Sequence, residues 1–253
     1  MISHQSDAGS AANATAAATS LQRLLPAITL GCALLVVWIL RHPFVGLTHD
    51  SQIYLIQGLA SLSPDLYSND IFLRYGSQDK FTIFSSVFAS AMGLLGIENA
   101  AVALTCTAQA AFILATILLA RVLMPERLVW VSIALLSAVP AVYGPGQIFS
   151  VLEDFVTPRL FAETLGIVGL VAFLRGRIWL AAAFGLVSML LHPLMAMGGI
   201  VVAILASTMP LRVKAFIFAG GALVAAAALA WLGLHGHQVV FDEFWELLLR
   251  WGR

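Results

Sequence analysis

Charged side chains are scarce in this sequence. Only 10% of its 253 residues are Asp, Glu, Lys or Arg, whereas soluble domains carry about 25%. Hydrophobic residues make up 60% of the chain, and its mean hydropathy is +0.95. Water alone cannot solvate a surface so poor in charge, so most of it must face lipid or other apolar helices. The composition therefore predicts an integral membrane protein.

An excess of charge of either sign is also missing, because 13 basic residues balance 13 acidic ones. Without a basic stripe we expect no nucleic-acid partner. The two cysteines, Cys32 and Cys106, each lie inside an apolar run, which is typical of small hydrophobic residues rather than of a disulfide or a metal pair. The sequence also lacks the common phosphate-loop, zinc-protease and nucleophile-elbow motifs.

Long apolar runs are abundant. A membrane-spanning helix needs about 20 such residues, and a membrane barrel would instead alternate polar and apolar residues. We therefore predict an all-α fold, a polytopic transmembrane helical bundle of about seven to eight spans. The runs cover residues 24–40, 81–97, 100–124, 128–143, 160–174, 178–191, 194–209 and 215–234.

Polar segments flank this predicted transmembrane domain, which covers residues 23–234. The Ala-, Ser- and Thr-rich segment 1–22 is typical of a disordered tail, and segment 235–253 is predicted to be an interfacial helical tail. In the loop after the first run, Ile53, Ile56, Leu59 and Ala60 recur at helical spacing, which predicts a surface amphipathic helix. The Ala- and Gly-rich segment 219–230 would let a partner helix approach closely.

Basic residues predict the orientation, because cytoplasmic loops of membrane proteins are rich in Lys and Arg. We expect a multi-pass protein of the bacterial inner (plasma) membrane. Three turns carry pairs of basic residues and are expected on its cytoplasmic side: Arg121 with Arg127, Arg175 with Arg177, and Arg212 with Lys214. Residues 144–159 and His192 then lie outside. Counting back through three spans places loop 41–80 inside, unless one run between residues 81 and 143 does not cross.

His49 and Asp50, at the end of the first run, are the first candidate catalytic residues. A carboxylate beside an imidazole at a membrane surface can act as a base or bind a divalent cation. Asp50 is equally suited to cap the helix that follows it.

Glu153 and Asp154, followed by Thr157, Pro158 and Arg159, form the second candidate. Thr157 is expected to cap a helix that begins with Pro158. Adjacent carboxylates near a bilayer are often functional, although a solvated loop explains them equally well.

His192, followed by Pro193, lies between two apolar runs and needs a polar partner. Either a tight turn or a kinked helix accounts for this pair. A backbone group of a neighbouring helix would satisfy the imidazole as well as a functional site would. His235 and His237 are a weak metal signal.

The segments Thr48-His49-Asp50-Ser51-Gln52, 76–82, Asp154–Arg159 and Leu191–Ala196 resemble a family of uncharacterised bacterial multipass proteins that is itself similar to the GT-C superfamily of membrane glycosyltransferases. The resemblance covers residues 41–196. It implies a GT-C-like fold and transfer of a sugar from a polyprenyl-phosphate donor. The chain stops before the further spans with which such relatives continue.

The resemblance also implies residue roles. Asp50, with His49, would be the catalytic base, and Arg159 and His192 would bind the donor phosphate. Asp50, Glu153 and Asp154 would hold a metal, with Mg²⁺ or Mn²⁺ as the candidate cofactor. Two other hypotheses remain open, a transporter for a lipid or small solute and a non-catalytic membrane scaffold. The sequence therefore does not decide whether the protein is an enzyme.

Overall fold

The computed structural model describes residues 28–29, 31–33, 35–75, 77, 81–138, 142–143, 149–150 and 152–234. The predicted tails 1–22 and 235–253, with His235 and His237, lie outside these ranges. The regular secondary structure within these ranges is helical apart from one antiparallel pair of two-residue strands, β1 (Val142–Tyr143) and β2 (Phe149–Ser150). The all-α fold class is therefore confirmed.

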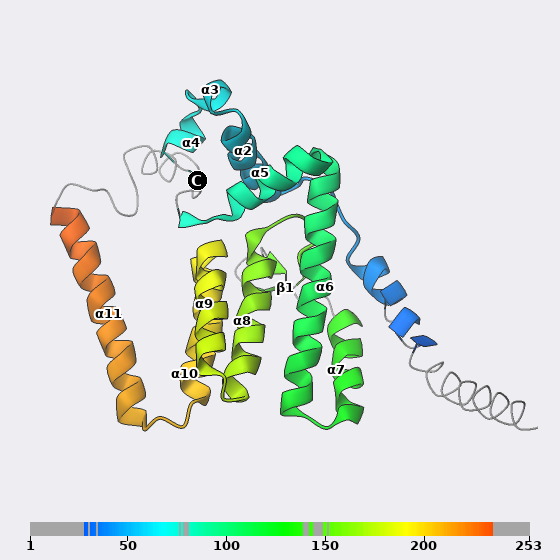
Figure 1. Cartoon of the computed structure of the whole chain (residues 1–253), viewed down its shortest axis with the longest axis vertical. Coiled ribbons are helices and arrows are strands. Elements are labelled where there is room, and N and C mark those ends of the chain that lie inside the picture. The colour runs from blue at the N-terminus through cyan, green and yellow to red at the C-terminus, as the bar shows by residue number, and fades with distance from the viewer. Residues whose placement is uncertain are drawn as a thin grey trace, which may run out of the picture.

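The helices fall into two groups (Figure 1). A cap at one end of the molecule contains α2 (Ser51–Leu62), α3 (Pro64–Tyr67), α4 (Ile71–Tyr75) and α5 (Phe84–Leu95). The long axis is built from α6 (Ile97–Leu123), α7 (Glu126–Ala138), α8 (Pro158–Leu174), α9 (Ile178–Leu191), α10 (Pro193–Ala206) and α11 (Leu211–Leu234). A further helical segment, Gly31–Arg41, precedes the cap.

Helix α8 is the centre of the bundle, since it packs against α6, α9 and α10. Its approach to α10 is close, and the tightest point is at Gly199. A Cβ atom added to Gly199 of α10 would lie 3.2 Å from the Cα atom of Gly166 on α8. Small residues at such contacts let helix backbones pack tightly. Helix α11 stands apart from the bundle in Figure 1, and none of its residues from 211 to 228 is buried.

The outer surface of the bundle is apolar, as expected for lipid contact. Trp179, Leu186, Leu205 and Phe216 are all exposed, and such continuous apolar exposure marks a membrane or protein contact surface. Two helical segments, Ile97–Leu123 and Leu211–Ala228, are long and apolar enough to cross a membrane. Helices α9 and α10 have 14 residues each, about 21 Å of helix, which is shorter than the roughly 30 Å hydrocarbon core.

The predicted span 81–97 is not a long helix. Only Phe84–Leu95 is helical, 12 residues that extend about 18 Å. This helix, α5, runs obliquely over the upper end of the bundle in Figure 1 and packs on α2 and α6. Just before it, the Thr82 hydroxyl donates to the carbonyl of Leu191 over 2.6 Å. Helix α5 is therefore not aligned with the long helices of the bundle.

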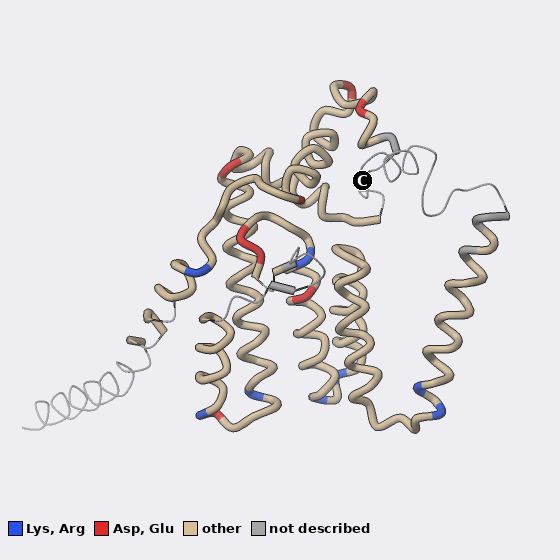
Figure 2. The backbone as a smooth tube through the Cα atoms, turned by 180° about the vertical axis from the view of Figure 1, so that it is seen from behind, with Lys and Arg blue, Asp and Glu red and all other residues tan. Residues whose placement is uncertain are grey.

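Charge is distributed unevenly along the bundle (Figure 2). Lys and Arg gather at the lower end, in the turns from α6 to α7, from α8 to α9 and from α10 to α11. Most acidic positions lie at the opposite end, with the cap and the segment that leads into α8. The three basic turns thus share one end, and both acidic loops share the other.

Helix α2 is present where the spacing predicted a helix, but its buried face differs from the expected apolar stripe. Its buried residues are Ser51, Tyr54, Gln57 and Gly58, whereas Ile53 is exposed. Gln57 is buried because its polar atoms have partners. Its side-chain oxygen accepts from Ser85 of α5 over 3.1 Å, and its side-chain amide donates to Ser77 over 3.1 Å. Specific polar contacts thus orient the helix, which a hydrophobic pattern does not report.

Candidate functional site

The centre of the candidate site is an ion-pair network at the cap end of the bundle. The Nη1 atom of Arg159 lies 2.7 Å from Oδ2 of Asp50, and Nε of Arg159 donates to Oε1 of Glu153 over 2.6 Å. Arg159 and Glu153 are only 6% and 3% exposed. Charges this deeply buried must be paired to be tolerated. The structure therefore brings together three of the predicted site residues from two distant loops.

Asp50 occupies the N-cap position of α2, but its side chain makes no capping hydrogen bond. Instead, its Oδ1 lies 3.0 Å from Nδ1 of His49 while its Oδ2 faces Arg159. The ring of His49 also packs on Phe155, with 5.7 Å between ring centroids. Four side chains thus form one chain of contacts, His49–Asp50–Arg159–Glu153, which we call the polar relay.

Arg159 is positioned by the start of α8. Thr157 caps this helix as predicted, since its hydroxyl accepts from the backbone N–H of Arg159, and Pro158 takes the first helical position. Proline is favoured there because its missing N–H would have no partner in the helix. The cap therefore fixes the backbone position of Arg159 in the first turn of α8, from which its side chain reaches Asp50 and Glu153.

Glu153 is held by its backbone as well as by Arg159. The side-chain amide of Gln109 on α6 donates to the Glu153 carbonyl over 3.0 Å, and Trp38 donates to the same glutamine over 3.3 Å. Burial raises the pKa of the Glu153 carboxyl, and the contact with Arg159 offsets only part of that effect. Glu153 is therefore not part of a solvated loop.

In the part of the chain that the structure describes, no side-chain hydrogen bond or ion pair joins the neighbouring Asp154 to the polar relay. It is half-buried, and its backbone carbonyl accepts from the amide of Val45 over 3.1 Å. This bond ties the segment before α8 to the segment before α2. Asp154 thus helps to hold the two loops together through its main chain.

The predicted Mg²⁺ or Mn²⁺ site does not fit this geometry. Within the described ranges, no group of three His, Cys, Asp or Glu residues is placed to hold a metal ion. Arg159 lies between the carboxylates of Asp50 and Glu153 and already supplies a positive charge there. These carboxylates therefore do not suit shared ligation of a second cation.

His192 forms the tight turn between α9 and α10. These helices pack side by side and run in opposite directions (Figure 1), so they are not halves of a kinked helix. The Nδ1 atom of His192 accepts from the backbone N–H of Met195 over 3.4 Å, which leaves the proton of the neutral ring on Nε2. Burial, with a smaller effect of the Arg159 charge, lowers the pKa of His192. The imidazole is therefore a neutral hydrogen-bond donor at pH 7.

A pocket of about 290 Å³ is lined by Pro158, the residue that precedes Arg159 of the polar relay. Tyr54, Thr82, His192 and Leu194 also line it. It lies where α2, the linker before α5, the start of α8 and the turn to α10 meet. We call it the head pocket, because its polar groups lie at the cap end of the bundle.

Tyr54 is a site residue that the sequence analysis did not identify. It is buried in α2, lies edge-on to Phe84 at 5.5 Å between centroids, and lines the head pocket. Burial raises the pKa of Tyr54 to about 12, although Arg159 acts in the opposite direction. Its position four residues after Asp50 places it on the same side of the first helical turn, which was the only available signal.

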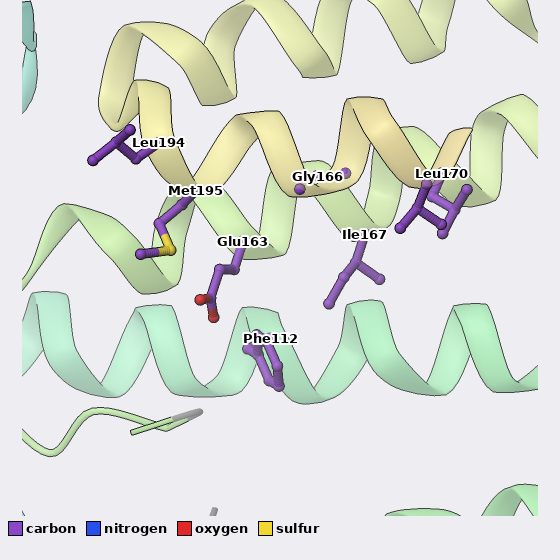
Figure 3. A pocket seen from close by; sticks show the side chains of 10 residues that line it. Phe112, Glu163, Gly166, Ile167, Leu170, Leu194 and Met195 are labelled. Atoms are coloured by element: carbon purple, nitrogen blue, oxygen red, sulfur yellow. The ribbon is translucent and has the colours of Figure 1, made fainter. Parts of the chain in front are cut away.

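A second, larger pocket of about 400 Å³ lies between α6, α8 and α10 (Figure 3). We call it the apolar groove, since its lining is hydrophobic except for Glu163. Figure 3 shows Phe112 of α6 facing Glu163 and Ile167 of α8 across this space. Leu194 lines both the apolar groove and the head pocket. The two pockets therefore adjoin at that residue.

Comparison of the chain with models of protein families, with curated proteins and with solved structures gave no match.

Proposed function

We propose that this protein is a multi-pass membrane glycosyltransferase of the GT-C type that uses a polyprenyl-phosphate-linked sugar as its donor. The observation that carries the proposal is the meeting of Asp50, Arg159 and Glu153 at one end of the bundle. Such a reaction needs a proton acceptor and a positive charge close together. The polar relay supplies both beside a pocket.

The two adjoining pockets support a lipid-linked donor. A hydrocarbon chain would lie in the apolar groove between α6, α8 and α10, where it meets apolar side chains. The phosphate and sugar would then reach the head pocket past Leu194, which lines both spaces. An apolar path that ends at a few polar groups is what an amphipathic ligand requires.

The proposed chemistry combines His192, which lines the head pocket, with the polar relay. The neutral His192 donates a hydrogen bond to the donor phosphate, and the positive charge of Arg159 stabilises the negative charge that develops on it. The His49–Asp50 pair takes the proton of the acceptor hydroxyl. A single displacement at the sugar carbon then inverts its configuration. General base catalysis of this kind contributes about 10²- to 10⁴-fold.

The proposal includes a topology in the bacterial inner membrane. The proposed spans are segment 31–41 and helices α6 to α11. In Figure 1, α6 to α11 follow the long axis, whereas segment 31–41 slants away from it and α5 crosses the upper end. The basic lower end faces the cytoplasm, because positive residues are retained there. The polar relay and the head pocket then open outside, where lipid-linked sugars and surface glycans meet.

A transfer assay tests this function. The full chain in lipid nanodiscs would be given a radiolabelled geranylgeranyl-phosphate glucose and a bacterial membrane glycan extract as acceptor. We expect labelled product from the wild type, and a loss of at least 100-fold in Asp50→Asn and Arg159→Ala, in line with the removal of a general base or of a charge stabiliser.

Arg121→Ala is the matched control, because Arg121 forms an exposed pair with Glu126 at the opposite end of the bundle. It should transfer sugar at the wild-type rate. Equal transfer by wild type, Asp50→Asn and Arg159→Ala, at equal protein levels, would contradict an enzymatic role of the polar relay. A flux of labelled donor across proteoliposomes without any product would instead favour a carrier.

A further inference from the structure

The two oxygens of Asp50 have different partners. Oδ2 accepts from Nη1 of Arg159 over 2.7 Å, and Oδ1 lies 3.0 Å from Nδ1 of His49. A proton placed on Asp50 would remove the negative charge that pairs with the buried guanidinium of Arg159. Breaking one side of such a buried pair is strongly unfavourable. Asp50 is therefore better suited to hold its neighbours than to collect a proton.

The contact with Asp50 also determines the tautomer of His49. An ionised carboxylate only accepts hydrogen bonds, so the imidazole nitrogen facing it must carry the proton. That nitrogen is Nδ1, which leaves Nε2 of the neutral ring with its lone pair. Ser-His-Asp enzymes use the same logic, in which the carboxylate fixes the tautomer and the far nitrogen accepts the proton.

His49 combines an unusual backbone conformation with a half-exposed side chain. His49 has φ of +53°, a left-handed conformation that is uncommon for a residue other than glycine. Residues in this conformation concentrate at functional sites. Phe155 packs on one side of the ring, and the side chain is 48% exposed. The ring is thus fixed by its contacts yet open to a molecule that approaches from the cap end.

We infer that Nε2 of His49 is the proton acceptor of the proposed transfer reaction and that Asp50 is its positioning residue. Arg159 and Glu153 hold Asp50 in turn, so the polar relay acts as one support for the imidazole. This inference rests on the proposed function for its chemistry but not for the tautomer it requires.

The acceptor hydroxyl gives its proton to Nε2, and its oxygen forms a bond to the anomeric carbon of the sugar. The bond from that carbon to the phosphate oxygen breaks, and its electron pair leaves with the lipid phosphate. The resulting imidazolium, stabilised by the charge of Asp50, then loses its proton to water.

Nitrogen NMR tests the tautomer without any activity. The full chain would be labelled with ¹⁵N-histidine and reconstituted in nanodiscs, and the signal of His49 would be assigned from its loss in His49→Gly. We expect neutral His49 to carry its proton on Nδ1 in the wild type and to shift toward the Nε2-protonated form in Asp50→Asn. A wild-type His49 protonated on Nε2 would overturn the inference.

Chemical rescue tests the role in the reaction. Glycine adopts a φ of +53° without strain, so His49→Gly is expected to fold. It should lose about 10²- to 10⁴-fold in transfer of the geranylgeranyl-phosphate glucose probe and regain at least tenfold when free imidazole is added, whereas Asp50→Asn should not respond to imidazole. Activity of His49→Gly within threefold of the wild type, or no rescue, would overturn the assignment.

The two measurements separate the two claims. A wild type that transfers no sugar yet shows the Nδ1-protonated tautomer contradicts the proposed function, and with it the role of Nε2 in transfer, and leaves only the tautomer assignment standing. A wild type that transfers sugar with the opposite tautomer contradicts only the role of His49.

Discussion

Arg159 and Asp50 are 109 positions apart in the chain, and their side chains are joined by a hydrogen bond of 2.7 Å. This contact connects the start of α2 to the start of α8, and through Arg159 it extends to Glu153. A surface pair of this kind would contribute little to stability. Here the guanidinium is buried, so the contact links the stability of the cap to that of the bundle.

Replacement of Arg159 by methionine should destabilise the protein strongly. The change leaves the carboxylate of Glu153 buried without its cation, for which the expected cost is about 3–5 kcal/mol. Thermal unfolding in mild detergent measures it. The exposed Arg121, paired with Glu126 over 3.1 Å, is the control, and Arg121→Met should change stability by less than about 1 kcal/mol. Equal effects of the two substitutions would contradict the buried network.

Alkaline pH should destabilise the protein through Tyr54. Its pKa is raised to about 12 in the folded state, compared with about 10 in an unfolded chain. The folded state therefore holds the phenol proton more tightly, a contribution present below pH 10 and lost as the pH rises from 10 to about 12. Two units correspond to about 2–3 kcal/mol.

Tyr54→Phe removes this contribution because phenylalanine does not titrate. The free energy of unfolding would be measured between about pH 9 and 12, a range that includes both pKa values of Tyr54. It should fall less steeply with pH in the variant than in the wild type. Parallel curves would show that Tyr54 ionises equally in both states.

Acidic pH should destabilise the protein through His192. Burial lowers the pKa of this imidazole in the folded state, so the unfolded chain takes up its proton first as the pH falls below about 6.5. The contribution of His192 to stability is therefore fully present above that pH and declines below it. His192→Asn keeps an oxygen that can accept from the Met195 amide but cannot titrate. Its unfolding should depend less on pH between about 5 and 7, and an unchanged slope would contradict the lowered pKa.

The contact of α8 with α10 should not tolerate a methyl group at Gly199. The added Cβ would lie 3.2 Å from Gly166 Cα, so the backbones would have to separate, and we expect a loss of about 1–3 kcal/mol. The adjacent Gly198 has no atom within 4 Å of such a Cβ. Gly198→Ala should be neutral or slightly stabilising in the same unfolding assay, since alanine favours helix.

The positions of the helices along the chain were largely predictable from the sequence. Ile178–Leu191 coincides with the predicted run, and α8 begins where Thr157 and Pro158 indicated. Hydrophobic runs and capping residues are local signals, which is why they succeed. The length of α5 was not predictable in the same way, because apolar composition alone does not distinguish a short helix on the end of a bundle from a span.

The residues of the polar relay could be singled out from the sequence, but their contacts could not be predicted. His49, Asp50, Glu153 and Arg159 stood out because charges are rare in this chain. Their arrangement depends on α5 remaining at the cap end, a property of tertiary packing. Tyr54 was missed because a tyrosine in a helix is usually a core residue, and its place beside Arg159 appears only when α2 and α8 meet.

The account depends most directly on the two acidic loops sharing one face of the membrane. Single cysteines at Leu66, Leu194 and Leu211, which are 82%, 77% and 80% exposed, would be introduced into a chain with Cys32 and Cys106 changed to alanine. Intact cells would then be treated with a membrane-impermeant thiol reagent. The account predicts labelling at positions 66 and 194, and labelling at 211 only after the membrane is permeabilised. Labelling of position 66 together with 211, and apart from 194, would contradict it, because Asp50 and Arg159 would then lie on opposite faces.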